Sequence, residues 1–235
     1  TISGISYGVA SSILSDKTDE NMLVTGEKYS NELDGWFGEQ EELMDTLSAG
    51  LAATNNYSYK AVCKYLLDNM NTLNEDDYIY DLYFTNTDNV MACASGYVPD
   101  GTIDYTTERE WYTSAVETGE VYCSTPYLDS DSGRIVITIS KAIYRGDELM
   151  GVMAEDIFVD TIIDVINNAN LPENSYAFLL DSNNGLVVHP NEAYGYVDDE
   201  PIALSDISDT PYKELQEAIE NKKFDEVITL SDYDK

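Results

Sequence analysis

The feature that most constrains the fold is a helical pattern that runs through residues 1 to about 53. Apolar side chains recur there every three to four residues and leave a polar face of Glu, Asp and Gln. They are Tyr29, Leu33, Trp36, Phe37, Leu43, Met44, Leu47 and Leu51. A helix of more than about 40 residues is unusual in a globular domain, so we expect a stalk or spine, followed by a second helix at 57–73.

After residue 77 the pattern changes to short β-rich runs separated by turns. The expected strands are 78–85, 90–95, 121–127, 134–144 and 149–157, with helices at 108–117 and 158–168. The turns between them carry Asn, Asp and Gly, which favour hairpins. Strands that follow one another through hairpins favour an antiparallel sheet, and with the helices they indicate an α+β fold.

A boundary is expected at 170–174, where the sequence reads NLPEN. Beyond it we expect strands at 176–181, 186–189 and 226–230 and a helix at 211–221. The turns NTDN and SNNG each join two strands, so the chain is consistent with two versions of one module. The expected division is a spine at 1–53 and modules at 54–169 and 170–235.

The charge of the chain excludes several classes of partner. Twelve Lys and Arg against 45 Asp and Glu give a net charge of −33, and nucleic acid or an anionic membrane needs a basic surface. A hydrophobic content of 43% still indicates a folded protein. The single histidine, His189, leaves no basis for a histidine-rich metal site or most acid–base triads. We therefore expect no enzymatic activity, no metal and no cofactor.

One sequence motif resembles a calcium site but lacks two of the residues that such a site needs, and a common hydrolase motif is absent. The stretch 129–133 (DSDSG) begins like an EF-hand loop, but Arg134 stands where glycine is needed and Ser140 where the bidentate glutamate belongs. No Gly-x-Ser-x-Gly nucleophile motif is present.

The three cysteines cannot all pair with one another, although a Cys93–Cys123 bridge is left open. No run of 18 apolar residues occurs, so no transmembrane helix is expected. The small apolar residues at the start are typical of a cut inside a helix, as in an ectodomain taken from a longer protein.

Arg109 lies in the densest aromatic stretch around any cation of the chain, residues 105–112 (YTTEREWY). A guanidinium held between indole and phenol rings can bind a carboxylate through two parallel hydrogen bonds. The alternative is a surface arginine stacked on Trp111, with its charge balanced by Glu108 or Glu110.

Tyr127 and Asp129 share one face of an expected strand, so a phenol and a carboxylate can converge on one ligand. Asp156 ends a largely apolar strand, and a carboxylate there needs a rim position or a cationic partner. The alternatives are turn chemistry for Asp129 and a helix N-cap before Phe158 for Asp156.

At this point the chain resembles the double Cache (dCache) extracellular ligand-binding domain of bacterial chemoreceptors (methyl-accepting chemotaxis proteins) and sensor kinases. The leading helix, the segment 78–156 and the stretch YAFLLDSNNGLVVHP all fit, so the resemblance covers nearly the whole chain. Its amino-acid-binding subgroup carries a signature that is matched by Arg109, Trp111, Tyr112, Tyr127, Asp129 and Asp156.

The resemblance implies a role for each residue. Arg109 and Trp111 hold the α-carboxylate of the ligand, and Tyr127, Asp129 and Asp156 hold its ammonium. These roles agree with the physics, because a buried zwitterion needs an opposite charge at each end.

The sequence departs from the family around the arginine. Tyr112 would line the pocket. Five residues before the arginine the family usually has a tyrosine, and this chain has Asp104 at that position. Tyr105 follows it as a candidate for the same role, and the sequence leaves open whether an altered turn brings it to the same place. The proline between arginine and tryptophan is Glu110 here.

The resemblance also implies the architecture. The spine at 1–53 would carry a membrane-distal, ligand-binding Cache module at 54–169 and a membrane-proximal module at 170–235. Each would be a PAS-like antiparallel sheet flanked by helices. Transmembrane helices and a cytoplasmic signalling domain would lie outside this chain, and a homodimer could form through the N-terminal helix.

The expected function is that of an extracellular sensor domain that binds an L-amino acid. One alternative is the same fold binding a short carboxylate, amine, purine or pyrimidine. Another is an acidic cell-surface interaction module without a small ligand. The net negative charge predicts that neutral or cationic amino acids bind in preference to anionic ones.

Overall fold

Two packed helices lie in the N-terminal third of the chain, α1 (Thr18–Ala52) and α2 (Tyr59–Leu73). The sequence period correctly identifies the buried face of α1, whose buried residues are Tyr29, Leu33, Trp36, Phe37, Gln40, Met44, Leu47, Ser48 and Leu51. α1 continues through Gly35 and Gly38. The Tyr65 hydroxyl donates to the Leu47 carbonyl at 2.8 Å, and Gly50 lies against the same hydroxyl. The two helices approach closely because Gly50 has no Cβ.

The expectation of helix from residue 1 is wrong. Residues Ile5–Ser11 form strand β1, which pairs antiparallel with β8 (Ser175–Asp181) along its full length. Ile5, Tyr7 and Val9 alternate with smaller residues, which suits a strand. Residues 5–11 form a strand because they pair with a segment about 170 residues away. The spacing of apolar residues within a short segment does not reveal such a distant partner.

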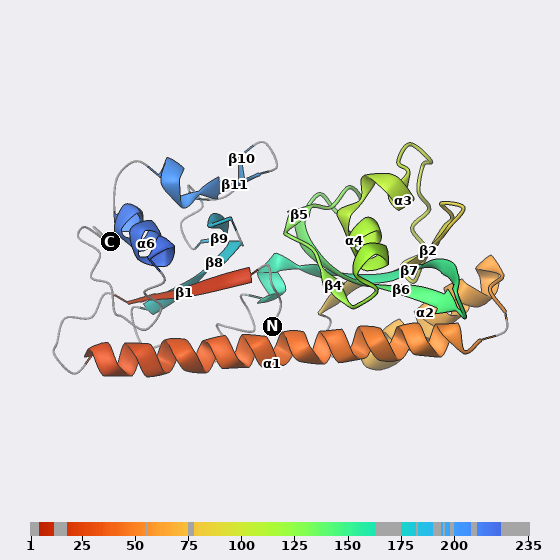
Figure 1. Cartoon of the computed structure of the whole chain (residues 1–235), viewed down its shortest axis with the longest axis horizontal. Coiled ribbons are helices and arrows are strands. Elements are labelled where there is room, and N and C mark those ends of the chain that lie inside the picture. The colour runs from red at the N-terminus through yellow and green to blue at the C-terminus, as the bar shows by residue number, and fades with distance from the viewer. Residues whose placement is uncertain are drawn as a thin grey trace. The chain divides into compact units, whose positions relative to one another are not determined.

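The computed structural model describes residues 5–11, 18–54, 56–74, 78–162, 175–181, 183–189, 194, 196–197, 200–207 and 211–221. The chain divides into two compact units, Trp36–Phe158 and Thr1–Gly35 with Val159–Lys235. The unit boundary therefore falls after Phe158, and the N-terminal strand joins the later part of the chain. Figure 1 shows the elements of both units.

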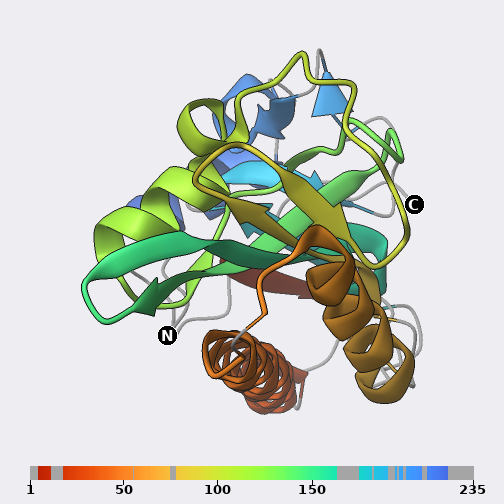
Figure 2. The same cartoon turned by 90° about the vertical axis from the view of Figure 1, so that its right-hand side faces the viewer.

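The unit Trp36–Phe158 is built on an antiparallel sheet with helices on both faces. Its strands follow the order β3-β2-β7-β6-β4, and β5 also pairs with β6. Their bounds are β2 (Ile79–Asn86), β3 (Met91–Cys93), β4 (Tyr122–Cys123), β5 (Tyr127–Leu128), β6 (Ile135–Arg145) and β7 (Glu148–Phe158). Within this unit, α1 and α2 cover one face, and α3 (Tyr105–Glu108) and α4 (Glu110–Thr118) cover the other (Figures 1 and 2).

The predicted hairpins are confirmed. One predicted helix and one predicted strand each form as two shorter elements. The helix expected at 108–117 is replaced by α3 and α4, which meet at Arg109 in an extended conformation. The strand expected at 121–127 is replaced by the short strands β4 and β5. Pro126 stands between them, and it cannot donate a hydrogen bond to a sheet.

The second unit also contains an antiparallel sheet, with the order β1-β8-β9-β11-β10. Its further elements are β9 (Gly185–Val188), β10 (Tyr196–Val197), β11 (Glu200–Ala203), the 3-10 helix η2 (Leu204–Asp206) and α6 (Pro211–Glu220). The β8–β9 hairpin and α6 were predicted, whereas β10, β11 and η2 were not. Residues 159–162 are helical, and the rest of the helix expected at 158–168, the boundary at 170–174 and the strand at 226–230 lie outside the described residues.

A Cys93–Cys123 disulfide is excluded by sheet topology. Cys93 ends β3 and Cys123 ends β4, which are the two edges of the sheet. Four steps of about 4.8 Å separate them by roughly 19 Å, far beyond the Cα distance that a disulfide spans. All three cysteines are free.

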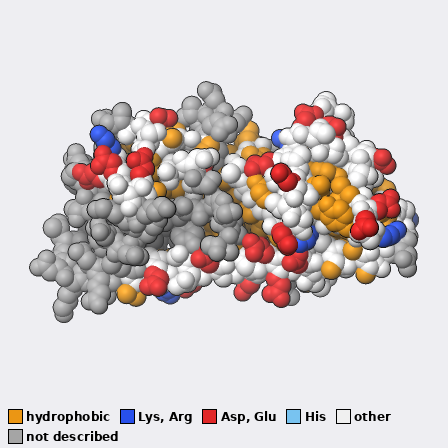
Figure 3. All heavy atoms as spheres, in the orientation of Figure 1, with side chains coloured by type: hydrophobic (Ala, Val, Ile, Leu, Met, Phe, Trp, Pro, Cys, Tyr) orange, Lys and Arg blue, Asp and Glu red, His pale blue; other side chains and the backbone are white. Residues whose placement is uncertain are grey.

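Acidic side chains are scattered over the face seen in Figure 3, where lysine and arginine are sparse. In the part of the chain that the structure describes, no helix is both long and apolar enough to cross a membrane.

Gly151 is the position where backbone geometry most restricts the side chain. It lies in β7 with φ +147°, and an added Cβ would lie 2.8 Å from the Asn86 Cα and closer still to the Thr85 carbonyl. We expect Gly151→Ala to lower the free energy of unfolding by roughly 3 kcal/mol, measured by urea denaturation.

Gly38→Ala is the control for this substitution. Gly38 lies on an exposed part of α1 with nothing near its Cβ position, so alanine should raise stability by up to about 1 kcal/mol. Equal stability of the two variants would contradict the steric account of Gly151.

Candidate ligand-binding site

A cavity of about 40 Å³ lies in the unit Trp36–Phe158, on the sheet face covered by α3 and α4. Its lining residues are Tyr80, Asp81, Tyr83, Met91, Cys93, Tyr97, Tyr105, Arg109, Trp111, Tyr127, Asp129, Ser130, Asp131 and Asp156. Six of the seven residues singled out in the sequence are among them. Tyr112 is not, since it is buried in the core with its ring 5.8 Å from that of Trp111.

Arg109 occupies the junction between α3 and α4 and is half-buried at the edge of this cavity. It forms no ion pair with any residue that the structure describes. Glu108 accepts a hydrogen bond from the Asp104 backbone at 2.9 Å, and Glu110 accepts one from the Tyr122 hydroxyl. The two glutamates that could have balanced its charge are therefore engaged elsewhere.

The other two arginines are stacked on aromatic rings. Arg134 lies 3.5 Å from the centre of the Phe158 ring, and Arg145 lies 4.7 Å from that of Tyr57. Arg145 also donates to the Thr54 carbonyl at 3.1 Å. Among the described arginines, only Arg109 lines the cavity, and its guanidinium is not stacked on an aromatic ring. It is therefore suited to bind an anion.

The altered turn before Arg109 places Tyr105 at the cavity. Asp104 caps α3 by accepting a hydrogen bond from the Thr106 backbone at 3.1 Å. Tyr105 begins the helix, is buried, and has its ring centre 6.3 Å from that of Trp111. The side chain of Asp104 is thus used in capping, and Tyr105 lines the cavity in its place.

Asp156 lies in the interior of β7, so the alternative of a helix N-cap does not apply. Only 5% of it is exposed. Its Oδ1 accepts hydrogen bonds from the Tyr83 hydroxyl at 2.8 Å and the Thr138 hydroxyl at 2.6 Å. Burial is the largest influence on the pKa of Asp156 and raises it, the two hydrogen bonds lower it, and the charges of Asp129 and Asp81 raise it, with a net value of about 7. Its Oδ2 accepts no hydrogen bond among the described residues.

Asp129 lies between a turn and the cavity. Its Oδ2 accepts hydrogen bonds from the backbone N–H groups of Asp131 at 3.2 Å and Ser132 at 2.6 Å, as the turn interpretation predicted. Its Oδ1 has no partner among the described residues, although the side chain is 8% exposed. Turn formation therefore uses one oxygen and leaves the other for a ligand.

The sequence interpretation missed eight of the lining residues: Tyr80, Asp81, Tyr83, Met91, Cys93, Tyr97, Ser130 and Asp131. Most of them come from the hairpin β2–β3. Asp81 and Tyr83 are two residues apart on β2, and Asp81 is paired in register with Asp156. Alternation along β2 could have placed Asp81 and Tyr83 on one face, but only the register shows that this face is shared with Asp156.

Asp81 lines the cavity, but its side chain is used in hydrogen bonds within the protein. It is buried, and its oxygens accept hydrogen bonds from the Leu82 and Ser95 backbones and from the Ser95 hydroxyl. Burial raises its pKa and the bonds from Ser95 lower it. With three donors already bound, Asp81 has little capacity left for a ligand.

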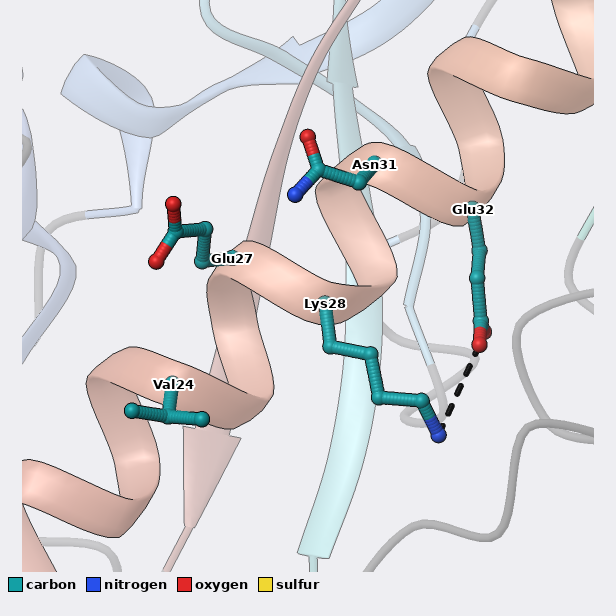
Figure 4. Close-up of a pocket in the computed structure, with 5 residues that line it drawn as sticks. All are labelled: Val24, Glu27, Lys28, Asn31 and Glu32. Atoms are coloured by element: carbon teal, nitrogen blue, oxygen red, sulfur yellow. Dashed lines mark ion pairs between the residues drawn. The ribbon is translucent and has the colours of Figure 1, made fainter.

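A second hollow lies on the N-terminal half of α1 and is formed by one face of that helix (Figure 4). Lys28 and Glu32 pair there at 3.5 Å, one helical turn apart. Val24 beside them is 61% exposed. The hollow is open surface whose one cation is already paired, so it offers no site comparable to the cavity. No group of His, Cys, Asp or Glu in the described parts of the chain is arranged to hold a metal ion.

Asp156 and Glu155 should make the protein more stable in mild acid. Their ordinary pKa values are 3.8 and 4.5, and in the folded protein burial raises them to about 7 and about 8. Between these values the folded protein binds more protons than the unfolded chain. The free energy of unfolding should therefore fall as pH rises from about 5 to about 8.

Urea denaturation across this range measures the effect. Glu155→Gln should reduce the slope by up to about 1.4 kcal/mol per pH unit, whereas Thr85→Val, which replaces a fully buried side chain that does not titrate, should not change it. An identical slope in Glu155→Gln and the wild type would show that Glu155 titrates normally.

The fold and cavity can be compared with known proteins. The methyl-accepting chemotaxis protein PscA of Pseudomonas syringae pv. tomato is 33% identical over 124 residues, 48% of this chain and 19% of that protein. The ligand-binding domain of the Pseudomonas aeruginosa chemoreceptor PctB, solved with L-Arg, superposes with a TM-score of 0.68 at 21% identity, covering 82% of this chain and 77% of that one.

The ligand-binding domain of the Pseudomonas fluorescens chemoreceptor CtaA, solved with L-valine, gives a TM-score of 0.65 at 21% identity and covers 77% of this chain and 78% of that one. At such identities these likenesses show the fold. The Cache domain family dCache_1 matches residues 10–232, which is nearly the whole chain. The protein therefore belongs to the double Cache (dCache) family.

Proposed function

We propose that the protein is the extracellular sensor domain of a membrane receptor and binds an L-amino acid in the cavity between the sheet and α3–α4. One observation carries the proposal: at separate places the cavity has a guanidinium without an ion pair and two carboxylates that each keep one oxygen without a partner among the described residues. Arg109 supplies the cation, and Asp129 Oδ1 and Asp156 Oδ2 supply anionic oxygens. A zwitterion satisfies both.

The roles follow from this arrangement. Arg109 binds the α-carboxylate, with Trp111 and Tyr105 beside it. Asp129, Asp156 and Tyr127 bind the ammonium. A charge-assisted hydrogen bond contributes about 1.5–3 kcal/mol, and the aromatic walls strengthen it by excluding water.

The lining also favours one charge class of ligand. Four carboxylates and one arginine line the cavity. One aspartate, Asp131, is exposed at the rim, where it accepts a hydrogen bond from the Tyr80 hydroxyl at 2.8 Å. A second carboxylate, on the ligand side chain, would add repulsion, so neutral or basic amino acids should bind more tightly than aspartate or glutamate.

The comparisons support a receptor. PscA is named as a methyl-accepting chemotaxis protein, and the PctB and CtaA domains were solved with amino acids bound. By this analogy the unit Trp36–Phe158 is the membrane-distal module, and the other unit is the membrane-proximal one. Transmembrane helices and a signalling domain belong to other parts of the receptor.

The mechanism involves no chemical reaction. The cavity has room for about three water molecules, so an amino acid must move the lining side chains apart. The opposite face of the same sheet packs on α1 and α2, and a shift of the sheet would change that packing. α1 would carry the change toward the membrane, and paired α1 helices of two copies would receive it.

A thermal-shift panel tests the ligand class. It should include the 20 amino acids, simple amines, short carboxylates, purines and pyrimidines. We expect one or more neutral or basic amino acids to raise the melting temperature, because amino acids carry both charges that the cavity matches and these two classes add no side-chain carboxylate. Stabilisation by another class alone, or strongest binding of aspartate or glutamate in calorimetry, would contradict the proposal.

Arg109→Ala tests the carboxylate end. Removal of the guanidinium should weaken amino-acid binding by about 10–100-fold in calorimetry. Arg145→Ala is the matched control, because Arg145 lies on Tyr57 outside the cavity lining and its loss should leave affinity unchanged. Equal affinities of Arg109→Ala and the wild type would show that the carboxylate binds elsewhere.

A further inference from the structure

Thr138 lies directly behind the ammonium end of the cavity and has no part in its lining. It is fully buried in β6, and strand register pairs it with Asp156 on β7. Its hydroxyl is 2.6 Å from Asp156 Oδ1 and 2.7 Å from the Tyr127 hydroxyl. Thr138 therefore links the two residues proposed to contact the ammonium.

The direction of these hydrogen bonds follows from proton counting. An ionised carboxylate only accepts, so the single hydroxyl proton of Thr138 points to Asp156. The hydrogen bond between Thr138 and Tyr127 must then be donated by Tyr127. The Tyr83 hydroxyl likewise donates to Asp156, at 2.8 Å. Neither Tyr127 nor Tyr83 has a hydroxyl proton left to point into the cavity.

This arrangement leaves three hydrogen-bond acceptors toward the ligand. They are Asp156 Oδ2, Asp129 Oδ1 and the Tyr127 hydroxyl oxygen, none of which accepts a hydrogen bond from another described residue. A primary ammonium has three N–H donors, and an α-hydroxyl has one. A ligand with an α-hydroxyl would leave two acceptors of a desolvated site unpaired, which is costly.

We propose that Thr138 is a positioning residue that makes this end of the cavity accept hydrogen bonds only, and so selects a primary α-ammonium over an α-hydroxyl. The inference rests on the proposed amino-acid function and names the group that this end recognises. Thr138 acts through Tyr127 and Asp156 and does not touch the ligand.

Loss of the Thr138 hydroxyl has two separable consequences. The Tyr127 proton loses its acceptor and becomes free to point at the ligand, where it repels an ammonium. Asp156 also loses a hydrogen bond that lowers its pKa, so its pKa should rise. Besides Thr138, the titratable and charged groups that interact with Asp156 are Asp81 and Tyr83 on β2, Cys93 on β3, Tyr127 on β5, Asp129 just after it, and the neighbour Glu155. All of them are unchanged in a Thr138 variant.

The experiment compares Thr138→Val, which keeps the shape of the side chain, with Thr138→Ser, which keeps the hydroxyl. Thr85→Val is the matched control, since Thr85 is also fully buried on a strand but its hydroxyl has no partner among the described residues. Calorimetry would use pairs that differ only at the α-substituent: L-alanine and L-lactate, L-valine and L-2-hydroxyisovalerate, and L-phenylalanine and L-phenyllactate.

The wild type, Thr138→Ser and Thr85→Val should bind the amino member of a pair at least about 10-fold more tightly than the hydroxy member. Thr138→Val should lose about 10–100-fold in affinity for the amino member and less for the hydroxy member. The pH below which amino-acid binding weakens should rise in Thr138→Val and remain unchanged in Thr138→Ser. If Thr138→Val does not fold, Thr138→Ala gives the same comparison.

The outcomes separate the two proposals. If no amino acid binds the wild type, the proposed function fails and the inference fails with it. If the wild type binds an amino acid but Thr138→Val keeps its affinity, its selectivity and its pH profile, the inference alone is overturned.

Discussion

The structure of the site depends on a carboxylate held inside the sheet. Asp156 lies on β7, which pairs with β2 on one side and with β6 on the other. Each neighbouring strand supplies one hydroxyl to the same oxygen, Tyr83 from β2 and Thr138 from β6. Sheet register thus fixes the position of the charge and of the groups that stabilise it. A carboxylate on a loop would lack this support.

β7 carries a second buried carboxyl, Glu155, on the opposite face of the sheet. It is fully buried, and neither of its oxygens has a partner among the described residues. Burial and, to a smaller extent, the charge of Asp156 raise its pKa to about 8, so the neutral form of Glu155 is favoured near pH 7. Because ionising both would place two charges at adjacent positions of one strand, a neutral Glu155 favours an ionised Asp156.

The sequence predicts most of the local elements but not the contacts that depend on register. The period of α1 and the hairpins of the sheet follow from spacing and turn residues alone. β1 does not, because its partner β8 is distant in the chain. The residues at the cavity likewise include some that the sequence predicts and others that only strand register reveals. Resemblance to a signature identified Arg109 and Asp156, whereas Thr138 emerges only when β6 and β7 are aligned.

The two ends of the cavity belong to different parts of the fold. Arg109 lies at the N-terminus of α4, and Asp156 lies within the sheet that α4 covers. An amine alone would bind the sheet, and a carboxylate alone would bind at the helix. An amino acid bound as proposed would tie α4 to the sheet, because its two charged groups are covalently joined. Recognition of both charges would then contribute more than affinity. The bound ligand would connect α4 to the sheet, and only a zwitterion could change the packing of this helix on the sheet.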